Sequence, residues 1–240
     1  MTIGFSLTEE QRMLQNLARD FARAEIAPVA EHYDRTAEFP WPVFEKARQA
    51  GLMNANIPFE YGGGGASLIE ECLLAEELAW GCSGISTSLT INNLAALPIL
   101  IAGNEEQKQG WLGRLTGKNQ LAAYCVTEPG AGSDVAGIAS TATRQGDEYV
   151  IKGSKTFISN ASHADFHVVF AYTDKAKRYK GMSAFIVERD RPGFSVSKKF
   201  DKLGQRASDT AEITLDNVVV PESHRLGKEG DGFMIAMKVF

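Results

Sequence analysis

The sequence predicts an α+β protein of several domains, in which an all-α helical bundle is followed by a small β-sandwich or β-barrel domain. In the first half, apolar residues recur at helical spacing behind N-capping patterns. From Leu121 onward, short runs rich in Val, Ile, Phe, Tyr and Thr alternate with turn residues roughly every eight to twelve positions. We therefore expect an N-terminal helical domain over 1–118 and a β domain over 119–229.

A further helical pattern occupies residues 231–240, with Phe233, Met237 and Phe240 on one face. It has no C-capping residue before Phe240, and an apolar face of this kind needs a covering partner. We therefore expect 230–240 to be the first helix of a C-terminal helical domain that these 240 residues do not contain.

The helices of the first half are marked by capping patterns and breakers. The predicted starts are Thr8 with Gln11, Pro42 at a first helical position, Ser67 with Glu70, and Asn104 with Gln107. The predicted ends are Pro28, Gly51, about residue 80 and about residue 115. The nearly uncharged stretch 83–102 predicts a helix inside the bundle despite Pro98, and the four glycines at 62–65 predict a flexible connector.

The second half is divided into short strands by its turn residues. The expected strands are 121–126, 138–144, 148–152, 155–159, 166–172, 182–187, 194–199, 210–215 and 217–220. Residues 145–147 and 152–154 each read as a hairpin turn around a glycine.

Composition bounds the class of protein. The chain has 240 residues, 44% apolar and 23% charged, with a net charge of −5, which argues against a nucleic-acid partner held by bulk electrostatics. Three cysteines without C-x-x-C spacing fit a reducing compartment, and His163 with His167 is a weak metal pair because they flank a predicted strand. With no signal-peptide pattern and no run of about 18 apolar residues, we expect no membrane span. We expect a cytosolic protein, or a mature form already stripped of a targeting segment.

The loop CVTEPGAGSDVAG at 125–137 is the most informative motif. Gly130 and Gly132 allow a backbone to approach a ligand closely, and successive N–H groups in such a loop can bind an anion. The hydroxyls of Thr127 and Ser133 suit the edge of a heterocycle or a pyrophosphate. From composition alone, residues 128–132 are interpreted as an ordinary turn and Phe157 as a core aromatic.

This loop, at the start of a β domain that follows a helical one, resembles the acyl-CoA dehydrogenase family, most closely its medium- and short-chain members. The resemblance also covers the segments GNEEQK (103–108), KTFISN (155–160), LGQRASDT (203–210) and GDGF (230–233). It implies FAD as cofactor, with two segments facing the flavin: Tyr124, Cys125, Val126, Thr127, Glu128, Pro129, Gly130, Ala131, Gly132 and Ser133, then Phe157, Ile158 and Ser159. Ser133 would also meet the acyl-CoA substrate. The family usually has Trp at the place of Phe157, so the packing beside the flavin ring would differ here.

The activity that the resemblance implies is α,β-dehydrogenation of acyl-CoA thioesters to trans-2-enoyl-CoA in fatty-acid or branched-chain amino-acid breakdown. A carboxylate takes the α-proton while flavin accepts the β-hydride. The resemblance places the general-base Glu beyond Phe240, so no catalytic base is assigned here and a chain ending at Phe240 would be inactive alone. Electron-transfer flavoprotein would accept the electrons, and the full-length protein would form a dimer or tetramer.

Two other readings stay open. The chain is alternatively a non-catalytic flavin- or acyl-CoA-binding module, or half of a split assembly that needs a partner chain. A third reading keeps the fold but changes the chemistry, as in the flavin monooxygenases and nitroalkane oxidases of the same superfamily; the match to the dehydrogenase loop disfavours it.

Overall fold

A computed structural model describes residues 6–240 of the chain. The residues form two compact units. The first contains 6–59, 63–90 and 202–208, and the second contains 60–62, 91–201 and 209–240. Each unit is described by itself below.

The first unit is helical. Its elements are α1 (Glu9–Phe21), the π-helical turn η1 (Ala22–Ile26), the 3-10 turn η2 (Ala27–Val29), α2 (Ala30–Thr36), α3 (Trp41–Gln49), α4 (Leu68–Gly81) and α5 (Ser83–Ala102), of which the residues to Thr90 belong to this unit. The predicted capping boxes form: the Gln11 N–H donates to Thr8 Oγ1 at 3.1 Å, and the Ser67 N–H donates to Glu70 Oε2 at 2.6 Å.

The predicted end at Pro28 is wrong, because helical backbone continues through it as η2 and α2. Pro28 lies in the first turn of a new helical segment, where a missing N–H costs no internal hydrogen bond. The segment ends instead at Ala37, which has a left-handed backbone with φ 55°. Pro42 takes the second position of α3 rather than the first, and Gly51 follows the end of that helix with φ 71°.

The four glycines form a tight turn rather than a loose connector. Gly63, Gly64 and Gly65 donate backbone hydrogen bonds to Pro58, Asn54 and Ile57. A Cβ on Gly63 would lie 2.0 Å from the Ile57 carbonyl oxygen, so only glycine permits this approach.

Helix α5 meets the length and composition of a membrane-spanning helix, with a mean hydropathy of 1.5 over its best window. This differs from the sequence-based expectation because Ser, Thr and Asn interrupt the apolar run without adding charge. Half of that window is buried inside the protein, and the buried side chains include Ser86, Ser88 and Asn92. Both observations favour a core helix.

The second unit contains the short helical segments α6 (Glu105–Gln107), η4 (Lys108–Leu112) and α7 (Gly113–Gly117), followed by one eight-stranded sheet. Its strands are β1 (Ala122–Cys125), β2 (Thr141–Gln145), β3 (Glu148–Ser159), β4 (Phe166–Tyr172), β5 (Met182–Glu188), β6 (Phe194–Lys199), β7 (Thr210–Pro221) and β8 (Arg225–Leu226). The strand order is β6-β7-β3-β2-β4-β5-β8, with β1 paired in parallel to β4. Tyr149, Phe185 and Ile213 belong to its buried core.

Two expected strand breaks are absent from the sheet. The predicted hairpin at 152–154 is wrong: β3 runs unbroken through Gly153 and pairs along its length with β7, which also unites two predicted strands. A β-bulge takes up the irregularity, because Ile151 pairs with Val218 and Gly153 with Leu215. Gly153 has φ 147°, and a Cβ there would lie 2.2 Å from Ser140 Oγ. The other predicted hairpin, at Gly146, does form and joins β2 to β3.

The chain ends in α8 (Gly232–Val239), as the helical pattern predicts. Ile235 and Ala236 are buried, and the close approach of Gly232 to the backbone of Ser183 places the helix start against β5.

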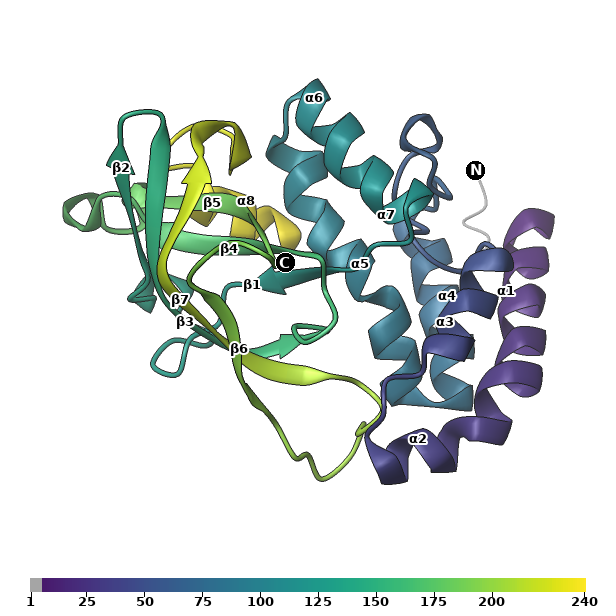
Figure 1. Cartoon of the computed structure of the whole chain (residues 1–240). Helices are drawn as coiled ribbons and strands as arrows, with labels where there is room; N and C mark the ends of the chain where they lie inside the picture. The colour runs from purple at the N-terminus through teal and green to yellow at the C-terminus, as the bar shows by residue number, and fades with distance from the viewer. Residues whose placement is uncertain (1–5) are drawn as a thin grey trace. The chain divides into compact units, whose positions relative to one another are not determined.

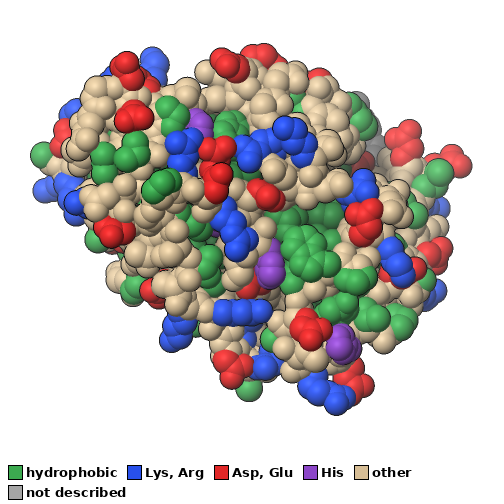
Figure 2. Space-filling model, viewed as in Figure 1, with side chains coloured by type: hydrophobic (Ala, Val, Ile, Leu, Met, Phe, Trp, Pro, Cys, Tyr) green, Lys and Arg blue, Asp and Glu red, His purple; other side chains and the backbone are tan. Residues whose placement is uncertain are grey.

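On the face shown in Figure 2, basic and acidic side chains are interspersed, which is typical of an ordinary solvated surface.

Candidate functional site

The loop predicted to hold a ligand leaves the end of β1 and enters β2. It exposes Pro129, Gly130, Gly132 and Ser133, while Thr127 is half-buried. The Glu128 and Ala131 backbones exchange two hydrogen bonds, each 3.0 Å from nitrogen to oxygen, which closes a tight turn at the tip. Within residues 6–240, the Gly132 and Ser133 N–H groups donate to no protein acceptor. The loop therefore presents a rigid tip with free donors beside it.

The two glycines of the loop border open space. A Cβ on Gly130 or Gly132 would meet no protein atom within 4 Å, and neither residue has a positive φ. Protein packing and backbone strain therefore do not require glycine at these positions. Space left for a bound molecule is a physical reason for it.

The Glu128 carboxylate holds the loop from inside. It accepts hydrogen bonds from the Ala139 and Ser140 backbone N–H groups, from the Ser140 hydroxyl, and from Lys155 Nζ at 2.7 Å. Burial acts to raise the pKa of Glu128, but Lys155 and the hydrogen bonds outweigh it, so the pKa lies below its usual value. Glu128 is therefore an ionised structural anchor.

Lys155 is the partner of that anchor and is completely buried in β3. Besides Glu128, its ammonium donates to the Val126 carbonyl oxygen at 3.2 Å. Burial lowers the pKa of Lys155, and the Glu128 carboxylate opposes the shift. In the sequence, Lys155 was named only within the segment 155–160, and no role was predicted for it. The available signal was a cation in a predicted strand. In the structure, its neighbours Thr156 and Ile158 are buried as well.

The second predicted segment lies directly beside the first. The Thr156 N–H donates to the Thr127 carbonyl oxygen at 2.9 Å. Phe157 has a left-handed backbone, φ 56°, at a β-bulge between Lys155 and Ile158, and its side chain is 64% exposed. Bulges of this kind re-aim a side chain and are frequent beside active sites.

The exposed Phe157 ring stacks on Phe200, with centroids 4.8 Å apart and an interplanar angle of 28°. An aromatic face is thus presented next to the loop, as expected at this position. Ser159, two residues further on, is half-buried, and Ile158 between them is buried.

Three predicted site residues lie on or just after β1 and are buried: Tyr124, Cys125 and Val126. The Tyr124 hydroxyl has no hydrogen-bond partner within the described part of the chain, and burial raises its pKa. Buried hydroxyls usually have a hydrogen-bond partner, so this one is an exception; the Tyr124 ring packs edge-on against Phe170 and Phe240. Burial also raises the pKa of the Cys125 thiol, so Cys125 is a neutral core residue rather than a nucleophile.

The two histidines considered for metal binding do not form a metal site. His167 is fully buried and its Nε2 lies 3.3 Å from the Ala161 carbonyl oxygen. Among residues 6–240, no group of three or more His, Cys, Asp or Glu side chains is arranged to hold a metal ion.

The thirteen predicted residues are thus gathered around one junction. Its accessible edge offers the hydroxyls of Thr127, Ser133 and Ser159, and free backbone N–H groups, beside the exposed Phe157 ring. Buried beneath it lie an ion pair and apolar side chains. Such an edge can hydrogen-bond a flat heterocycle and an anionic linker.

Two family models match the chain. The acyl-CoA dehydrogenase N-terminal domain matches residues 8–119, and the acyl-CoA dehydrogenase middle domain matches 123–218. The chain belongs to the acyl-CoA dehydrogenase family. The resemblance found in the sequence, and the helical-then-β fold class it implied, are confirmed.

Individual relatives agree with the family. The chain is 43% identical, over 99% of its length, to the probable medium-chain specific acyl-CoA dehydrogenase 2, mitochondrial, of Caenorhabditis briggsae, and covers 59% of it. A chain in the structure of the electron transferring flavoprotein of Acidaminococcus fermentans is similar with a TM-score of 0.95 and 40% identity, over 99% of this chain and 63% of that one. An acyl-CoA dehydrogenase complexed with FAD from Bacillus anthracis is similar with a TM-score of 0.86 and 34% identity, over 98% of this chain and 40% of that one. The chain therefore spans less than two thirds of these relatives.

Proposed function

We propose that this chain forms the helical and flavin-holding part of an FAD-dependent acyl-CoA dehydrogenase, an oxidoreductase that converts acyl-CoA thioesters to trans-2-enoyl-CoA. The observation that carries the proposal is the junction of 124–133 with 157–159. Among the described residues 6–240, this junction has open space at Gly130 and Gly132 and unpaired N–H groups at Gly132 and Ser133. Membership of the dehydrogenase family supports the chemistry.

FAD is the proposed cofactor, and the residues fit it. Free N–H groups in a loop suit a pyrophosphate, and the orphaned Tyr124 hydroxyl is a buried donor that a bound cofactor can satisfy. The FAD complex of the Bacillus anthracis relative supports the same assignment. When bound, FAD supplies the hydride-accepting chemistry.

The residues of this chain bind, orient and exclude water. Thr127 and Ser159 offer hydroxyls to the heterocycle edge, and Phe157 offers an aromatic face. Ser133, exposed at the end of the loop tip, is proposed to meet both the cofactor and the acyl-CoA. The buried Val126 and Ile158 add apolar surface to the inner side of the junction, beside the Glu128–Lys155 pair.

The proton of the substrate is taken up by another group in this proposal. Glu128 is unsuited to be the base, because its oxygens already accept from two backbone N–H groups, one hydroxyl and one ammonium. Exposed Asp134 belongs to the same loop and is not proposed either. We propose a glutamate beyond Phe240 as the general base.

The partners of the protein are proposed from the same family relationship. An acyl-CoA is the substrate, electron-transfer flavoprotein is the electron acceptor, and the protein forms a homo-oligomer. The structure of the electron transferring flavoprotein of Acidaminococcus fermentans, which contains a chain similar to this one, supports the acceptor. The mitochondrial relative supports the matrix as the location in a eukaryote, with the cytoplasm as the bacterial equivalent.

An acceptor-dye assay tests the proposal. Full-length protein loaded with FAD should bleach the dye with at least one acyl-CoA of a panel running from butyryl- to palmitoyl-CoA and including branched chains. Residues 1–240 alone should not. Turnover by 1–240 alone would refute the placement of the base. FAD-loaded full-length protein that turns over no acyl-CoA would favour a non-catalytic module or a half-assembly.

A further inference from the structure

A buried ion pair connects the two segments proposed to face the flavin beneath the surface. Lys155 Nζ lies 2.7 Å from Glu128 Oε1, and the side chains are 0% and 6% exposed. Glu128 belongs to the loop and Lys155 to β3, two residues before Phe157. The pair therefore links two parts of the chain 27 residues apart in sequence.

Each member of the pair also holds backbone. Glu128 accepts from the Ala139 and Ser140 N–H groups, and so gathers the far end of the loop. Lys155 donates to the Val126 carbonyl oxygen at 3.2 Å, and so fixes the near end. Both ends of the loop are thus attached to Lys155 on β3, one end directly and the other through Glu128.

Thr127 lies between Val126 and Glu128, the two residues to which Lys155 donates hydrogen bonds. Its carbonyl oxygen accepts from the Thr156 N–H at 2.9 Å, on the residue next to Lys155. The place of its side chain relative to Phe157 is therefore set by contacts on both sides of the junction. Loss of the ammonium would release Val126 and Glu128 together.

Burying two ions is a poor route to stability, since their desolvation offsets most of their attraction. A buried pair that also takes part in four further hydrogen bonds can specify geometry instead. We propose that the Glu128–Lys155 ion pair is the positioning element that sets the two flavin-facing segments relative to each other and thereby determines FAD affinity. This inference rests on the proposed function, and it assigns neither residue a contact with the flavin.

FAD titration of the purified apoprotein tests the inference, read by flavin fluorescence and by the visible absorption band of the bound flavin. Glu128→Gln and Lys155→Met should each raise the Kd for FAD by roughly tenfold or more and change the shape of that band, at temperatures where circular dichroism shows a folded protein.

The double variant Glu128→Gln/Lys155→Met separates positioning from stability. It leaves no unpaired buried charge, so its melting temperature should recover toward that of the wild type. Its FAD affinity should stay low, because the Val126 carbonyl oxygen and the side chain at position 128 no longer contact an ammonium on β3. A double variant that regains both stability and affinity would overturn the inference.

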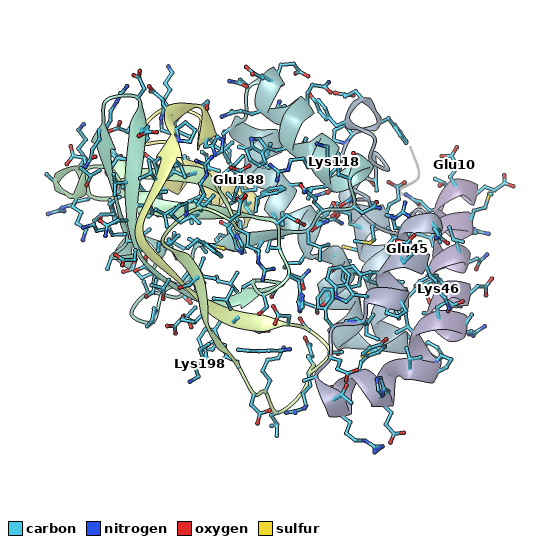
Figure 3. The ribbon with its side chains drawn as sticks, in the orientation of Figure 1. Glu10, Glu45, Lys46, Lys118, Glu188 and Lys198 are labelled. Carbon is cyan, nitrogen blue, oxygen red and sulfur yellow. The ribbon has the colours of Figure 1, made fainter. Side chains whose placement is uncertain are left out.

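Glu188→Gln is the matched control. Glu188 lies at the end of β5 and accepts from Arg114 Nη1 at 3.0 Å, with side chains 25% and 23% exposed, and it contacts neither flavin-facing segment through these bonds (Figure 3). The substitution removes the partly buried ion pairs of Glu188 with Arg114 and with Arg191 from the same unit, and it should leave the Kd within about twofold of the wild type.

The FAD affinities of the wild type and the variants test the proposed function and the role of the ion pair separately. Wild-type protein that binds no FAD would refute the proposed function and the inference together. Wild-type protein that binds FAD, with folded single variants that bind it within about twofold, would refute the inference and leave the function standing.

Discussion

Acidification should destabilise this protein through His167. The imidazole is fully buried in β4, packs 4.4 Å from the Phe194 ring, and lies 3.3 Å from one backbone carbonyl oxygen. Desolvation lowers its pKa to about 4, and the nearby Arg189 guanidinium adds to the shift. The unfolded chain has the ordinary value of about 6.5.

The direction of the pH effect follows from the number of protons that His167 binds in the folded and in the unfolded state. Between about pH 6.5 and about pH 4 the unfolded state binds a proton at His167 that the folded state does not, so stability falls as pH falls through this window. From about pH 7 to about pH 5 the two values give a loss of about 2 kcal/mol in the free energy of unfolding. Below about pH 4 the folded state is protonated as well, and this contribution stops growing.

Urea unfolding of wild type and His167→Phe at both pH values measures this contribution. Phenylalanine keeps a ring against Phe194 but cannot be protonated, so the other titrating groups cancel in the comparison. The wild type should lose about 2 kcal/mol more than the variant between the two pH values. Equal losses in the two proteins would refute the assignment of a depressed pKa to His167.

Substitutions of glycine test two reasons for glycine at a position: a backbone or packing constraint, and space for the proposed cofactor. Gly153→Ala should cost about 1–3 kcal/mol in urea unfolding, because its φ of 147° and the Cβ contact with Ser140 Oγ at 2.2 Å both exclude a side chain. Gly146→Ala, where a Cβ meets open space at φ 62°, should cost only about 1 kcal/mol; a larger loss there than at Gly153 would contradict the packing argument. Gly130→Ala and Gly132→Ala should leave unfolding unchanged and weaken FAD binding, since their free space is proposed for the cofactor; unchanged FAD affinity in both would contradict that use.

The helices and most strands were predictable because their signals are local. Capping boxes at Thr8, Ser67 and Asn104 require only residues three positions apart, and all three form. The join within β3 was not predictable, because Gly153 reads as a turn until its partner strand is known. Strand continuity there is decided by the long-range pairing with β7, which a local pattern does not contain.

The candidate site was predictable in outline and not in its interior. Glycines and hydroxyls in the loop were visible as a ligand-binding pattern, and their positions in the structure agree with an open edge. Lys155 was missed as a functional residue because its partner Glu128 is 27 positions away. The exposure of Phe157 depends on a bulge and a left-handed backbone, which no local pattern of β-forming residues indicates. The domain boundaries and the roles of the site residues stay predictions.

A crystal structure of the protein reconstituted with FAD tests the central claim most directly. We predict electron density for the isoalloxazine and pyrophosphate against residues 124–133 and 157–159, with the Thr127 and Ser159 hydroxyls within hydrogen-bonding distance of the cofactor. FAD bound elsewhere on the chain, or absent from this junction in protein that binds it in solution, would contradict the claim.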